Sequence, residues 1–206
     1  MIEFQSGSIL SLLVFAIVMI MTPGPNNVMF MNSGAIYGLR KTVPHILGVS
    51  LGSPMVLFAV ATGGTILFKI KYVEGVFGFI CSLYLLYLAY KVATSKPPGG
   101  TVRSSKPFTF LESAGFQWVN PKIWSQYITV LGVYIGGADN YLSAVLFAAL
   151  IFAVIGIPNA IIWTIFGIFL SKFLKNKRSF RIFSITMAVI LVISVLPLVI
   201  NKYWLV

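Results

Sequence analysis

Apolar residues along the chain gather into six windows, which are separated by short stretches that are charged or rich in glycine. An α-helix that crosses a bilayer needs about 20 mostly apolar residues, and each window comes close to that length. The pattern therefore predicts an all-α membrane protein with six transmembrane helices. The windows cover residues 8–32, 43–68, 72–90, 113–135, 141–170 and 183–200.

The longest stretch between windows, 91–112, contains the sequence SKPPGG and divides the chain into two halves. Each half has three windows, so the second half enters the membrane inverted relative to the first, a plan that many transporters share. We therefore expect a first three-helix repeat over 1–90, a cytoplasmic basic linker over 91–112 and a second repeat over 113–206. Within each half, the first window holds an Asn/Pro cluster and the second a Gly/Pro cluster.

Lysine and arginine are distributed unevenly between the two sets of loops. One set holds eleven of the 15 basic residues, and the positive-inside rule makes that side cytoplasmic, so both termini should face outward. The other side has three, and Lys122 falls within a window. The eleven are Arg40, Lys41, Lys91, Lys96, Arg103, Lys106, Lys172, Lys175, Lys177, Arg178 and Arg181.

The sequence MTPGPNN at 21–27 interrupts the first window. Pro23 and Pro25 lack the N–H that a helix uses, and each clashes with the carbonyl four residues back. The helix should therefore end near Met21 and restart near Pro25, because proline is well tolerated at the first helical position. The restart is expected to leave free backbone N–H groups at Asn26, Asn27 and Val28.

Unpaired backbone groups in hydrocarbon cost several kcal/mol each, so this interruption should face a protein interior or a water-filled cavity. A helix N-terminus carries about +0.5 of an elementary charge and binds anions, including carboxylates. A proline kink that only adjusts packing is the alternative. The candidate substrate-binding residues here are Thr22, Pro23, Gly24, Pro25, Asn26 and Asn27.

A second interruption opens the fourth window, where Pro121 releases the carbonyl of Gln117 and lies between Asn120 and Lys122. These four residues join the candidate substrate site, and the two interruptions are expected to form one central site. Lys122 has two interpretations: its ammonium pairs with a substrate carboxylate or with Glu112, or its long side chain reaches the cytoplasmic interface.

Prolines in the second window of each half would free the carbonyls of Ser50 and Val154, which are acceptors suited to an ammonium group. A site that offers N–H groups to an anion and carbonyls to a cation matches a zwitterion. Ordinary kinks, with Gly48 and Gly52 as a close-packing face, are the simpler interpretation. The candidate gating or kink residues are Pro54, Pro158 and Asn159.

The composition agrees with a membrane protein: 58% of residues are hydrophobic and 9% are charged. A net charge of +11 could indicate a nucleic-acid partner in a soluble chain, but here the charges lie between apolar segments. One histidine, one cysteine and four acids are too few for most enzyme or metal sites. We therefore expect no enzyme activity, cofactor, metal site or nucleic-acid partner.

Coupling to protons normally uses a titratable group inside the membrane, and the candidates are Glu112, His45 and Lys122. An ordinary interfacial position is the favoured interpretation for His45. The tryptophans fit the aromatic belts at membrane interfaces, where Trp118, Trp124 and Trp204 would be anchors.

The sequences TPGPNN, GVSLG, YLLYLAYKVATS and FQWVNPK, in this order, are similar to those of the LysE/RhtB family of bacterial amino-acid exporters. The resemblance covers nearly the whole chain and is greatest to the cysteine/O-acetylserine exporter group. It implies two inverted three-helix repeats in the inner membrane and proton-coupled export of amino acids. The paucity of intramembrane acids favours a small neutral substrate over a dibasic one. A metal or ion exporter and a non-transporting scaffold are the alternatives, and homo-oligomerisation is left open.

Overall fold

The regular secondary structure is entirely helical in the part that the computed structural model describes, residues 9–63, 73–95, 106–136, 138–174 and 176–203, and this part contains no strand. The all-α class is therefore confirmed. In chain order the helices are α1 (Ile9–Met21), α2 (Pro25–Ala61), α3 (Val73–Ala93), α4 (Phe110–Trp118), α5 (Pro121–Thr129), the π-helix η2 (Val130–Ile135), α6 (Tyr141–Ser171) and α7 (Lys177–Tyr203).

Both predicted interruptions are present. Helix α1 ends at Met21, and α2 restarts at Pro25 after Gly24, whose backbone is extended. Helix α4 ends at Trp118, and α5 restarts at Pro121. In each case proline occupies the first turn of the second helix, where its missing N–H breaks no intrahelical hydrogen bond.

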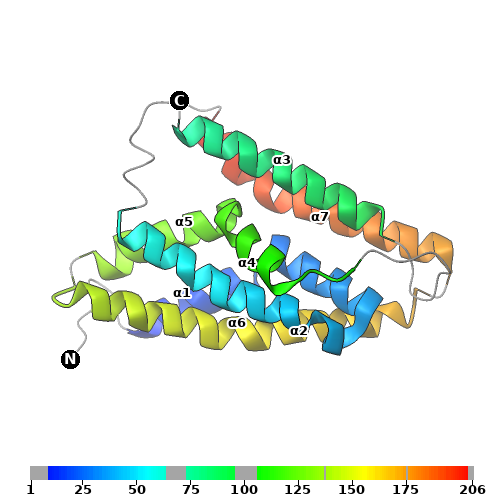
Figure 1. Ribbon diagram of the computed structural model, residues 1–206, viewed down its shortest axis with the longest axis horizontal. Helices are drawn as coiled ribbons and strands as arrows, with labels where there is room; N and C mark the ends of the chain where they lie inside the picture. The colour runs from blue at the N-terminus through cyan, green and yellow to red at the C-terminus, as the bar shows by residue number, and fades with distance from the viewer. Residues whose placement is uncertain (1–8, 64–72, 96–105, 137, 175, 204–206) are drawn as a thin grey trace.

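Helix α2 bends sharply at Gly38, which has φ 77° and ψ 173° inside an otherwise helical stretch of 37 residues. At about 1.5 Å per residue, a straight helix of that length would be far longer than the ~30 Å core of a bilayer. A positive φ favours glycine because other residues carry a Cβ that clashes there. The bend divides α2 into two arms, 25–37 and 39–61 (Figure 1).

The first arm of α2 crosses α6 at very short range. A Cβ built on Gly34 would lie 2.1 Å from the Thr164 carbonyl oxygen, and one built on Gly167 would lie 2.0 Å from that of Met31. The two backbones therefore touch through a pair of glycines, one from each helix, as in close-packed membrane helices.

The second arm of α2 packs against α4 in a similar way. A Cβ on Gly48 would lie 2.4 Å from the Phe110 carbonyl oxygen, and one on Gly52 would lie 2.6 Å from the Ala114 Cα. The close-packing face expected from the Gly48/Gly52 spacing is therefore confirmed, and it places α4 against the arm that carries Pro54.

Helices α3 and α7 lie side by side as a separate pair above the others in Figure 1. Buried leucines, among them Leu85 and Leu88 of α3 and Leu191 of α7, join this pair to the first arm of α2. By length and hydropathy, two described helices, α2 and α6, are able to cross a membrane.

The helices begin and end close to the predicted windows, with some differences. The stretch 33–42 between the first two windows is helical except at Gly38. The predicted linker 91–112 is helical at both ends, because α3 continues to Ala93 and α4 begins at Phe110. Residues 96–100 of the SKPPGG sequence and residues 64–68 of the second window lie outside the described residues.

Candidate functional site

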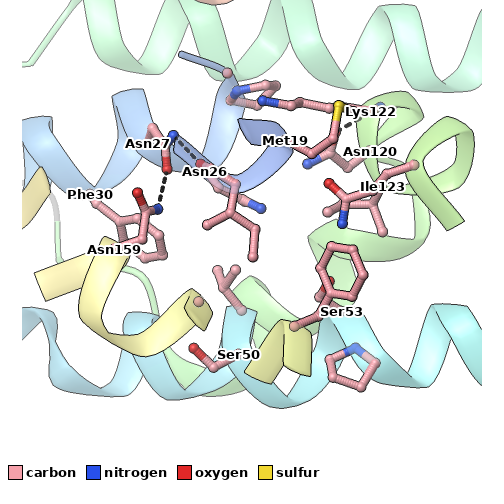
Figure 2. Close-up of a pocket in the computed structure, with 18 residues that line it drawn as sticks. Met19, Asn26, Asn27, Phe30, Ser50, Ser53, Asn120, Lys122, Ile123 and Asn159 are labelled. Carbon is pink, nitrogen blue, oxygen red and sulfur yellow. Dashed lines mark hydrogen bonds between the residues drawn. The ribbon is translucent and has the colours of Figure 1, made fainter. Parts of the chain in front are cut away.

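A cavity lies where the two interrupted helices meet, between α2, α5 and α6 (Figure 2). It measures about 70 Å³ as space open to the centre of a water molecule. About 10–15 Å³ of such space holds one water, so the cavity has room for several waters or for a small ligand. Among its lining residues are Gly24, Pro25, Asn26, Asn27, Ser50, Pro54, Asn120, Lys122, Gln126, Gly156 and Asn159.

Lys122 extends from the first turn of α5 toward the break between α1 and α2. Its Nζ donates a hydrogen bond of 2.7 Å to the carbonyl oxygen of Thr22, just beyond the end of α1. The side chain occupies the space that a Cβ on Gly24 would need, 2.9 Å from Nζ. Lys122 therefore ties the two interruptions together across 100 residues of sequence, and its ammonium lies in the cavity wall.

Asn27 joins three helices through its side-chain amide. Its Nδ2 donates to the carbonyl oxygens of Ile20 at 2.8 Å and Thr22 at 3.0 Å, which lack intrahelical partners at the end of α1. Its Oδ1 accepts a hydrogen bond of 2.9 Å from Nδ2 of Asn159 on α6. Figure 2 shows these two amides next to one another at the cavity wall, and Asn27 shares the Thr22 carbonyl oxygen with Lys122. Asn159, expected from the sequence to take part in kinking or gating, thus lies in the central cavity.

Asn26 and Gln117 form a reciprocal pair of amides across the two interruptions. Asn26 Nδ2 donates to Gln117 Oε1 at 2.8 Å, and Gln117 Nε2 donates to Asn26 Oδ1 at 3.1 Å. Gln117 also donates to the carbonyl oxygen of Ser113 at 2.9 Å and is fully buried. This pair fixes α4 to the start of α2.

The field inside the cavity is positive. Helices α2 and α5 both begin at its edge, each with a partial positive charge at its N-terminus, and the Lys122 ammonium lies between them. A cation beside a helix N-terminus is unfavourable, so an anion placed there would be attracted by all three groups. One expectation was wrong: the N–H of Val28 is not free, because it donates to the Gly24 carbonyl at 3.0 Å.

Several lining residues were not expected from the sequence. Gln126 lies one helical turn after Lys122, on the same face of α5. Because the two residues are four apart, the sequence indicates Gln126 as well once Lys122 is taken as a site residue. Ser53 lines the cavity and shares a hydrogen bond with the buried Tyr127 hydroxyl. Ser50 was expected only for its carbonyl, whereas the residue itself lies at the cavity wall.

Of the candidate kink residues, Pro54 lines the cavity, whereas Pro158 lies within α6 and outside the lining. Thr22 takes part through its carbonyl oxygen, because its hydroxyl donates to Val18 in its own helix. Pro23 and Pro121 shape the two interruptions without lining the cavity.

The two remaining proton-coupling candidates lie away from the cavity. His45 is fully buried between the rings of Phe30 and Phe108, with centroid distances of 4.7 and 5.4 Å. Neither of its ring nitrogens has a hydrogen-bond partner in the described part of the chain. Glu112 is exposed and forms a capping box with Thr109 at the start of α4.

If the protein exports amino acids as its sequence indicates, the capping box predicts that Glu112→Gln leaves the pH dependence of export unchanged. The Thr109 backbone N–H donates to the Glu112 carboxylate at 2.8 Å and holds its pKa below its usual range, so Glu112 stays ionised at neutral pH. The variant should lose about 0.3–1 kcal/mol of stability, as expected for an acid in a first helical turn. Because the carboxyl pKa is lowered on folding, this contribution is present at neutral pH and lost as the pH falls through that pKa. Transport rates of both proteins between pH 5.5 and 8 would check this, and a flattened profile for the variant would contradict it.

The expectation that Trp124 anchors the chain at a membrane interface was wrong. Its side chain is buried, and its Nε1 donates a hydrogen bond of 2.8 Å to the carbonyl oxygen of Trp118. It therefore satisfies a free carbonyl at the end of α4. Trp118 is exposed, and Trp204 lies outside the described residues.

Comparison with known proteins places the chain in a family. The model of the family described as LysE type translocator matches residues 17–202. The chain belongs to this family. The resemblance seen in the TPGPNN and FQWVNPK sequences is thereby confirmed, and the family is one of translocators, not of enzymes.

The chain is also similar to named efflux proteins. The chain is 31% identical over 157 residues to a cysteine/O-acetylserine efflux protein of Klebsiella pneumoniae, covering 75% of this chain and 79% of the relative. It is 28% identical over 182 residues to the cysteine/O-acetylserine efflux protein of Escherichia coli strain K12, covering 86% and 90%. No solved structure matches the chain.

Proposed function

We propose that this protein exports small neutral amino acids or their derivatives, of the cysteine and O-acetylserine kind, across the bacterial cytoplasmic membrane. The observation that carries the proposal is the cavity at the two meeting interruptions, where Lys122 and two helix N-termini bring positive charge to a lining that also holds several amides. Family membership and the printed names of the relatives support it.

The binding mode follows from the charges around the cavity. The substrate carboxylate lies between the Lys122 ammonium and the start of α2, where both attract it. The substrate ammonium is then directed to the side-chain oxygens of Ser50, Gln126 and Asn159 across the cavity. The amides of Asn26 and Asn27 hold the helices in place, since both already bond to protein groups.

We further propose that the chain crosses the membrane six times, as two inverted three-helix repeats. The first crossing consists of α1 and the first arm of α2, and the fourth runs from residue 113 of α4 through α5 and η2. The bend at Gly38 separates the first crossing from the second. Each repeat then begins with an interrupted helix and continues with one that contains a proline, Pro54 or Pro158.

The basic residues support an orientation with both termini outside. The Gly38 bend, the end of α3 and the junction of α6 with α7 lie at one end of the molecule, and α1 begins at the other (Figure 1). The first of these ends carries basic residues such as Arg40, Lys91 and Lys177, which places it in the cytoplasm by the positive-inside rule.

Proton antiport is the proposed source of energy, and Lys122 is the ionisable side chain among the described residues that line the cavity. The alternatives are weaker. A metal exporter needs converging ligands, and no group of three or more His, Cys, Asp or Glu residues lies together in the described ranges. A scaffold protein predicts interruptions that pack without a cavity, whereas these surround a cavity lined in part by Lys122 and several amides.

Efflux from proteoliposomes that contain the purified protein tests the proposal. Vesicles loaded with single amino acids, including cysteine, O-acetylserine, threonine and lysine, are compared with and without a pH gradient. We expect the small neutral amino acids to leave faster than from protein-free vesicles, and the gradient to accelerate them. Absence of efflux for the whole panel would overturn the assignment, and efflux insensitive to the gradient would overturn proton coupling alone.

A further inference from the structure

A second cavity lies beside the first arm of α2, and it shares no lining residue with the central cavity. It is bounded by α2, the last turns of α3 and the segment that precedes α4. On the same measure it offers about 30 Å³, enough for the charged end of a small molecule. Its polar and aromatic lining includes Asn32, Ser33, Lys91, Ser95, Lys106 and Phe108.

Hydrogen-bond donors and acceptors are both present in this cavity. Lys91 Nζ lies 4.4 Å from the centroid of the Phe108 ring, a cation–π contact that holds the ammonium at the wall. Lys106 is exposed at the rim and adds a second positive charge. On the other wall, the Asn32 Oδ1 is buried and has no partner in the described part of the chain, while its Nδ2 contacts Ser95 Oγ at 3.4 Å.

A buried oxygen without a partner is costly, so the Asn32 Oδ1 favours a ligand that brings a hydrogen-bond donor. We propose that this second cavity is a loading site for the amino acid at the cytoplasmic face, a step that rests on the proposed export function. The substrate ammonium donates to Asn32 Oδ1, and its carboxylate pairs with Lys91 and Lys106. A phosphate would leave Asn32 Oδ1 facing another oxygen, so the two lysines together with this acceptor favour a zwitterion.

The wall between the two cavities is thin. Met29 lines the second cavity, and the next residue, Phe30, lines the central one. Behind Phe30 lies His45, which also contacts Phe108 of the second cavity. In this proposal, a shift of these three packed rings opens a path from the loading site to the central site, along the first arm of α2.

Export kinetics, measured with substrate supplied at the cytoplasmic face, distinguish the role of the second cavity from that of the central cavity. We expect Asn32→Leu and Lys91→Gln each to raise the KM of the best-exported amino acid about tenfold, as for loss of a hydrogen bond to a charged group, with kcat little changed. The matched controls are Lys41→Gln, which removes an exposed charge on the same side, and Thr94→Val, next to Ser95. Both should behave as the wild type. Unchanged KM values for the two test variants would overturn the loading-site proposal without contradicting the proposed export function.

Protection from labelling tests binding without transport. A Ser95→Cys variant is treated with a membrane-impermeant maleimide, and the native Cys81 is buried, so the new thiol is the accessible one. O-acetyl-L-serine should slow labelling at least about threefold more than inorganic phosphate does, because only the zwitterion satisfies both walls. Equal or greater protection by phosphate indicates a phosphate or lipid-headgroup site, and no protection indicates no site; each overturns the proposal. This readout remains valid if no amino acid is exported.

Discussion

Lys122→Gln is expected to lower kcat/KM for efflux by about ten- to a hundredfold, the cost of a lost hydrogen bond to a charged group. Glutamine keeps much of the length of the side chain and the ability to donate to the Thr22 carbonyl, but it removes the positive charge from the cavity. The measurement is initial efflux from proteoliposomes, with the pH profile recorded for both proteins. If the variant lacks the ionisable group that couples export to protons, its response to a pH gradient should be reduced as well.

Lys172→Gln is the matched control, because Lys172 is exposed at the end of α6 and belongs to the same basic side of the molecule. Its kinetics should equal those of the wild type. A Lys122→Gln protein with normal kinetics and a normal pH profile would show that the lysine serves only as a tether between the two interruptions. The proposed position of the carboxylate would then be wrong.

Gly34→Ala should destabilise the protein by about 1–3 kcal/mol or more, as overpacking of a close-packed interior does. The added Cβ would lie 2.1 Å from the carbonyl oxygen of Thr164, and a backbone atom cannot rotate away as a side chain can. The helices α2 and α6 must therefore separate, and Asn27 and Asn159 lie on these same two helices. Thermal unfolding in detergent measures the change, and the efflux assay should show a parallel loss of activity.

Gly115→Ala provides the comparison. Gly115 is exposed on α4, and a Cβ added there meets nothing within 4 Å. Alanine is the better helix former by about 0.5–1 kcal/mol, so this variant should be as stable as the wild type or slightly more stable. Equal stability of Gly34→Ala and Gly115→Ala would mean that the backbone contact between α2 and α6 contributes nothing.

The interruptions were predictable because their cause is local. Proline removes a backbone donor wherever it stands, so the ends at Met21 and Trp118 and the restarts at Pro25 and Pro121 follow from the residues themselves. The close-packing role of Gly48 and Gly52 was likewise visible in their spacing of four. The uneven distribution of lysine and arginine in the sequence likewise predicts an orientation in the membrane.

Contacts between residues far apart in the sequence could not be predicted. Asn26 pairs with Gln117, 91 residues away, and Asn27 pairs with Asn159, 132 residues away. The sequence contains many other amides that could have formed such pairs. Likewise, tryptophan is typical of interfacial anchors, but Trp124 is buried and donates a hydrogen bond to the Trp118 carbonyl, which is free because α4 ends there.

By itself, the sequence determined the helical class, the two interruptions and the family, since these depend on apolar length, on proline chemistry and on motifs read in order. Only the tertiary structure decided which polar groups face the cavity. It showed that Asn26 and Asn27 mainly bind protein groups, that Glu112 caps a helix, and that Lys122 lies between two helix N-termini. A side chain's electrostatic surroundings are set by the helices packed around it, and that packing brings together residues that no local pattern relates.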